Sequence, residues 1–223
     1  MKSVKRDYKF LKNTLFSLFC ITFSLFFVSC EAEATLEKAS DNSVTLSFSG
    51  KCGQYFENMI RTFSASDDQD SIFDADSIRN ELEKSGFKNV SVSLPDNSGL
   101  NIKITDSGSS YLFSSGLLSF NNGKLVLSVT PSVLKNFYNA SDNQTKAIFD
   151  LFISPVFNDE EMTEDEYLEL VGAFYGYEAS EEIKNCVFKL TLVSNTGSKI
   201  IQKIPLVELL TLTEKKSFSV TLN

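Results

Sequence analysis

Apolar and polar residues alternate in several short runs of the chain, a period-two pattern that is typical of half-buried strands. The runs cover residues 44–48, 90–94, 100–104, 124–129, 188–192, 199–204 and 218–222. Turn residues separate neighbouring runs: Pro95 to Gly99, Asn121-Asn122-Gly123 and Asn195-Thr196-Gly197. An Asn-Gly turn between apolar runs is a strong hairpin signal, and it predicts that 111–120 pairs with 124–129.

Other segments repeat with helical spacing. Tyr55, Phe56, Met59, Ile60 and Phe63 predict an apolar stripe on one helix. Further helices are expected over 75–85, from Pro131, over 142–157 and over 163–177, because N-cap residues and capping boxes precede them. Since hairpins dominate, we expect an α+β fold: mainly antiparallel sheet built from hairpins, with helices packed on one face.

The first 29 residues have the pattern of a secretory signal. Five basic residues precede residue 13, and residues 14–29 form an uncharged run rich in Phe and Leu. That run is shorter than the roughly 20 residues that a membrane-spanning helix needs. We therefore interpret residues 1–29 as a signal peptide.

The sequence Phe27-Val28-Ser29-Cys30 at the end of this signal resembles the lipobox of bacterial lipoproteins. Phe27 stands where Leu is usual, as in the relaxed lipobox of spirochaete-type lipoproteins. The resemblance implies that the Cys30 thiol is acylated and that Cys30 becomes the mature N-terminus. It also implies a cell-envelope protein, held by lipid to the inner or outer membrane at the periplasmic face or the cell surface.

The chain behind this signal is expected to contain a tether and one domain. Residues 30–41 are polar and poor in core residues, so we expect a flexible tether after the lipidated cysteine. Residues 42–223 are enough for a single α+β domain.

Charge and composition exclude several classes of function. The chain has 21 basic and 29 acidic residues, and removing 1–29 takes away five basic residues and Asp7, leaving a formal net charge of −12. Such acidity argues against nucleic acid and anionic lipid head groups as partners. Without histidine, no Ser-His-Asp triad and no His-ligated metal site is available.

Two cysteines remain in the exported domain. Cys52 follows one expected strand and Cys186 precedes another, so in an oxidising compartment the pair is a candidate disulfide. Two separate buried thiols are the alternative interpretation.

No coherent active site is found. Ser132 and Lys135 form an SxxK motif, and Ser141 begins an SDN motif, but their close spacing differs from that of serine β-lactamases, so we expect no catalytic residues. The acidic run from Asp67 to Asp76 lacks the glycine and the glutamate of a calcium-binding loop. We expect neither a metal nor a cofactor.

These observations predict a non-enzymatic binding or structural-interaction module on a membrane surface, whose protein partner or lipid ligand is unknown. The alternative is a carrier of lipid acyl chains, or a membrane-perturbing lipoprotein, that uses the apolar helices 142–157 and 163–177. In that interpretation Ile148, Phe149, Phe152 and Ile153 contact lipid.

Overall fold

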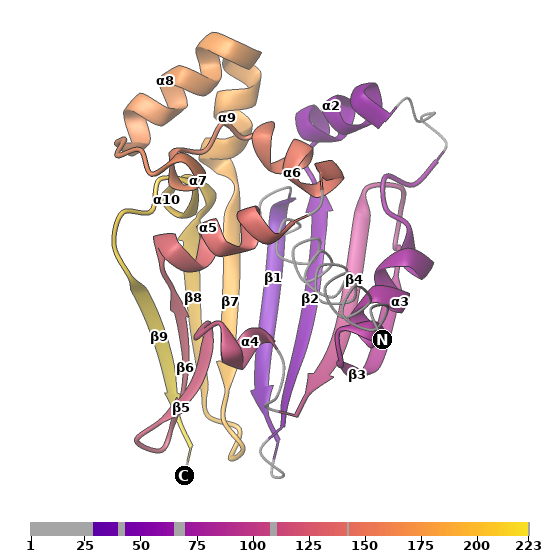
Figure 1. Ribbon diagram of the computed structural model, residues 1–223, viewed down its shortest axis with the longest axis vertical. Helices are drawn as coiled ribbons and strands as arrows, with labels where there is room; N and C mark the ends of the chain where they lie inside the picture. The colour runs from indigo at the N-terminus through magenta and orange to yellow at the C-terminus, as the bar shows by residue number, and fades with distance from the viewer. Residues whose placement is uncertain (1–28, 40–42, 65–69, 108–110, 142, 223) are drawn as a thin grey trace, which may run out of the picture.

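The computed structural model describes residues 29–39, 43–64, 70–107, 111–141 and 143–222, so the predicted signal peptide lies outside it except for Ser29. These residues form a six-stranded sheet, a three-stranded sheet and a set of helices (Figure 1). The helices are α2 (Gln54–Ser64), α3 (Ala75–Lys84), α4 (Tyr111–Ser114), α5 (Pro131–Ala140), α6 (Asn143–Asp150), α7 (Pro155–Asn158), α8 (Glu164–Tyr175), α9 (Tyr177–Asn185) and α10 (Leu206–Leu210). The predicted α+β class is confirmed.

The large sheet has the strand order β3-β4-β2-β1-β7-β8. Its strands are β1 (Ser29–Lys38), β2 (Val44–Cys52), β3 (Lys88–Ser93), β4 (Gly99–Asp106), β7 (Val187–Val193) and β8 (Lys199–Pro205). All neighbours are antiparallel except β1 and β7, which run parallel. The small sheet has the order β5-β6-β9, with β5 (Leu118–Asn121), β6 (Lys124–Val129) and β9 (Lys216–Thr221).

Strand β1 corrects the prediction of a flexible tether over 30–41. Residues 29–38 pair with β2 on one side, and residues 31–37 pair with β7 on the other, so this segment is a central strand of the large sheet. Ala32, Ala34 and Leu36 alternate with polar residues and are buried at 4% exposure or less. Alanine and glutamate are poor strand formers, and burial against neighbouring elements overrides that weak preference here.

The other differences from the sequence prediction concern helices. Residues 111–114 form α4 rather than the start of a strand, and only 118–121 pair with β6. The helix expected over 142–157 is divided into α6 and α7, because Pro155 begins a helix at its first turn instead of ending one. The capping box of Thr163 and Glu166 is present at the start of α8, but Gly176 stops that helix and α9 follows.

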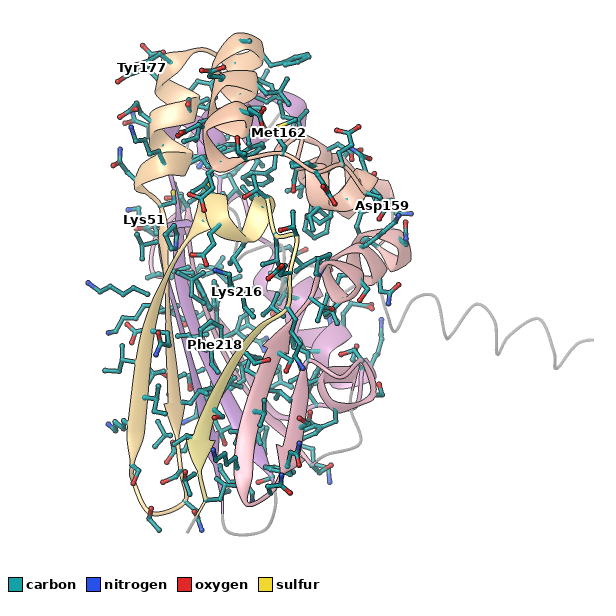
Figure 2. All side chains as sticks on the ribbon, turned by 90° about the vertical axis from the view of Figure 1, so that its left-hand side faces the viewer. Lys51, Asp159, Met162, Tyr177, Lys216 and Phe218 are labelled. Carbon is teal, nitrogen blue, oxygen red and sulfur yellow. The ribbon has the colours of Figure 1, made fainter. Side chains whose placement is uncertain are left out.

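One side of the large sheet carries the hydrophobic core. Its inner face is covered by helices and by the small sheet, which stands opposite it in Figure 2. The opposite side, at the left of Figure 2, has no helix or strand of the described residues over it. This face of the six-stranded sheet therefore has no covering layer, and its outward residues are exposed or half-buried except Thr191 and Val193.

Candidate functional site

The open face of the large sheet is built by the polar members of the alternating pattern. Residues directly opposite one another in a ladder lie on the same face of a sheet. One such row crosses all six strands and consists, in order, of Ser93, Asn101, Ser49, Glu33, Lys189 and Lys203. Parallel rows on either side consist of Ser91, Lys103, Ser47, Thr35, Thr191 and Ile201, and of Lys88, Thr105, Thr45, Glu37, Val193 and Lys199. We call this surface the open sheet face.

The charge of the open sheet face is opposite to that of the chain. Its three rows hold five lysines, at 88, 103, 189, 199 and 203, and two glutamates, at 33 and 37. The face therefore carries a formal net charge of +3, and the rest of the chain from residue 30 carries −15. An acidic protein thus presents one basic surface.

Two lysines on or beside the face have acidic partners. Lys189 pairs with Glu33 across the β1–β7 ladder at 2.9 Å, and Lys51 pairs with Asp96 at 2.7 Å. In contrast, Lys103, Lys199 and Lys203 are exposed and make no ion pair within the described part of the chain. Their ammonium groups are therefore available to an anion from outside the molecule.

The Asp96 carboxyl has a lowered pKa. The first cause is a hydrogen bond from the Lys51 ammonium, and the second is a hydrogen bond from the backbone N–H of Ser98. Both interactions favour the carboxylate. Lys51 therefore keeps its ion pair at neutral pH and loses it in acid.

We expect Asp96→Asn to destabilise the fold by less than about 1 kcal/mol at pH 7, because the ion pair is solvent-exposed. A carboxyl whose pKa is lower in the folded state stabilises the fold above its unfolded-state pKa, and loses that effect as the pH falls through its folded-state pKa. The difference between the two proteins should therefore shrink below about pH 4. Urea unfolding at a series of pH values measures it, and a difference that stays constant with pH would contradict the assignment.

A shallow depression crosses the open sheet face over strands β1 to β4. Its polar lining consists of Glu33, Thr35, Ser47, Ser49, Ser91, Ser93, Asn101 and Lys103, and the only apolar contributors are Phe48 and Ile102. Hydroxyl, amide and ammonium groups of this kind donate hydrogen bonds to anionic oxygen atoms. The open shape of this depression suits a flat partner better than a buried ligand.

Three cysteines lie at one end of the large sheet. Cys30 is the second residue of β1, Cys52 is the last of β2, and Cys186 directly precedes β7. Cys52 and Cys186 are both buried, but strand β1 lies between their two strands. Strand β1 therefore separates the strands that these two cysteines flank, and the disulfide stays a prediction.

The candidate lipid-contact residues pack against other side chains. Phe149 and Phe152 are each 1% exposed, and Phe152 stacks on Phe56 with ring centroids 4.6 Å apart. Phe149 makes an edge contact with Phe157 at 5.1 Å. Ile148 and Ile153 are half-buried against the same core. These contacts support a structural role for all four residues.

The remaining sequence motifs have local partners. The hydroxyl of Ser132 is hydrogen-bonded to that of Thr130, whereas the ammonium of Lys135 pairs with Asp159. Ser141 donates its hydroxyl to the carbonyl of Phe137. No group of three or more Cys, Asp or Glu able to hold a metal occurs among the described residues, and Asp67 and Asp68 lie outside them. Among the described helices, none combines the length and hydropathy needed to cross a bilayer.

Comparison with known proteins gives no further guide to function: the chain matches no protein-family model, no curated protein and no solved structure.

The open sheet face was not identified from the sequence alone. The sequence does contain its residues, which are the polar members of each alternating run, for example Thr45, Ser47 and Ser49 in β2. What the sequence does not contain is the strand order that places the lysines of β4 and β8 on one surface.

Proposed function

We propose that the protein is a lipid-anchored, non-enzymatic binding module of a bacterial cell envelope, and that the open sheet face is its binding surface. The observation that carries the proposal is the position of Cys30. The cysteine of the lipobox-like sequence is the second residue of a central strand, so a lipid on Cys30 is attached directly to the folded domain.

This attachment differs from the tethered arrangement expected from the sequence. A tether would let the domain move away from the membrane, whereas a cysteine within β1 keeps the domain against it. Because two or three acyl chains on one residue give stable attachment, the domain stays at the membrane surface. We therefore expect the protein to bind partners that lie on or close to that membrane.

The open sheet face supports binding rather than catalysis. It is broad and shallow and carries many polar side chains. Lys189 pairs with Glu33, whereas Glu37 and the lysines at 103, 199 and 203 are exposed. Catalytic acids and bases are usually enclosed in clefts that shift their pKa values. A surface of exposed lysines and hydroxyls instead provides many weak contacts to an extended partner.

The anchor is tested by Cys30→Ala in the full chain, expressed in a bacterium and labelled with a palmitate analogue. We expect complete loss of the label and release of the protein from the membrane fraction, because Cys30 carries the acyl chains. Cys20→Ala is the control, since Cys20 lies within the proposed signal and should leave labelling unchanged. Labelling that persists in Cys30→Ala would refute the lipid anchor.

A further inference from the structure

We propose that the open sheet face lies flat against the anionic phospholipid head groups of the membrane that holds the anchor. The proposal rests on the lipid anchor at Cys30 and names the partner of the surface described above. It reverses the expectation drawn from net charge, because the chain's acids lie mostly elsewhere than on this face.

Charge complementarity gives the first argument. The face has a formal charge of +3 and the remainder of the mature chain −15. Next to an anionic membrane, lysines within a Debye length of the surface are attracted, each by about 1 kcal/mol. The acidic remainder is repelled by the same field. The charge distribution therefore selects one orientation of the domain, with the open sheet face toward the lipid.

The position of the anchor gives the second argument. Glu31, next to Cys30, pairs with Val187 at the start of β7. Helix α9 directly precedes β7, and its nine residues extend the molecule by about 13 Å beyond this end of the sheet. Contact through this helical end would therefore hold Cys30 away from the membrane. Contact through the open sheet face keeps Cys30 close to the lipid surface, because Glu33, three residues further along β1, lies in a row of that face.

The side chains of this surface match a head-group layer. Lys103, Lys199 and Lys203 have long flexible stems that reach phosphates, and the serines and threonines between them donate hydrogen bonds. Ile201 is 56% exposed in the centre of β8, and Tyr177 is 72% exposed. Figure 2 shows Tyr177 on the same side of the molecule as Lys51. Tyrosine is favoured at membrane–water interfaces, where one end of its ring is wet.

A protein partner fits this surface less well. Stable protein interfaces have a central cluster of aromatic or aliphatic side chains that fill pockets. Among the outward positions of the three rows, Ile201 and Val193 are the only apolar residues, and Val193 is buried. An extended layer of phosphates needs no such cluster.

The test uses the lipidated protein reconstituted in vesicles of phosphatidylcholine alone, or of equal parts phosphatidylcholine and phosphatidylglycerol. Lysines are labelled with an amine-reactive reagent, and the rate at each site is measured by mass spectrometry. We expect Lys103, Lys199 and Lys203 to react about tenfold more slowly on the anionic vesicles, because head-group phosphates cover them. Lys124 and Lys215 are exposed elsewhere and serve as internal controls whose rates stay unchanged.

Matched double variants sharpen the test. Lys103→Glu with Lys203→Glu should abolish the protection of Lys199, whereas Lys124→Glu with Lys215→Glu changes the net charge equally and should retain it. High salt should also remove the protection. Equal rates at both groups of lysines on anionic vesicles would overturn the proposal.

Two other outcomes would overturn it in favour of a different partner. Protection that appears on phosphatidylcholine vesicles and grows with protein density would indicate a second copy of the chain. Protection that appears only in native envelope membranes, and not on anionic vesicles, would indicate a protein. Failure of the anchor itself is seen separately, because the protein would then not float with the vesicles.

Discussion

Replacing Phe152 with alanine is expected to lower the free energy of unfolding by about 3–5 kcal/mol, the cost of removing a large aromatic side chain from a filled core. Phe152 is 1% exposed and stacks on Phe56. Its carbonyl also accepts a hydrogen bond from the Tyr167 hydroxyl at 2.6 Å, which fixes the backbone at this point. Chemical denaturation followed by circular dichroism measures the change.

Phe174→Ala is the matched control, because Phe174 is 68% exposed and its loss should change stability by less than about 0.5 kcal/mol. The comparison also separates the two interpretations of the apolar helices. If Phe152→Ala left stability unchanged but reduced the amount of fatty acid that copurifies with the protein, Phe152 would line a lipid site rather than the core.

The second large effect is expected from Ala34→Glu in strand β1. Ala34 is 2% exposed, with a neighbouring strand on each side. A glutamate there would bury an unpaired carboxylate or break the strand pairing, which costs several kcal/mol. We expect the variant to be largely unfolded at room temperature, as judged by near-ultraviolet circular dichroism and by proteolysis.

Thr35→Glu introduces the same residue at the next position of the strand and should leave the protein folded. Thr35 lies on the open sheet face, half-buried and opposite Ser47, so its replacement can reach solvent. In a flexible tether the two substitutions would be equally harmless. A folded, stable Ala34→Glu protein would therefore show that residues 31–38 do not belong to the sheet.

The sequence predicted helices and strands well where the chain has a regular spacing of apolar residues or a helix-capping residue. Asp74 caps α3 through hydrogen bonds to the backbone N–H groups of Asp76 and Ser77, and Ile78 and Leu82 form the buried side, as expected. The hairpin of β3 and β4 follows from alternation on both sides of the turn at 95–99, with a register shift between Lys88 and Ser91. In each case residues close in sequence determine the structure.

The failures of prediction concern contacts between distant segments. Nothing near Ala32 or Ala34 indicates that β7 will lie beside β1, because their partners are more than 150 positions away. The same strand order bears on the candidate disulfide, which stays a prediction: β1 lies between the strands that Cys52 and Cys186 flank. The open sheet face depends on this strand order too, so its charge could not be read from the sequence.

The parallel pairing of β1 with β7 also sets an order of events during synthesis. β1 is the first described element of the chain, and β2 can pair with it early because it follows closely in the sequence. Its other edge stays unpaired until Val187 arrives, because residues 31 and 187 are neighbours in the sheet. Closing so long a loop is slow, and proteins dominated by such distant contacts fold slowly. The large sheet is therefore completed only when most of the chain has been synthesised, and until then the unpaired edge of β1 is open to pairing with another strand.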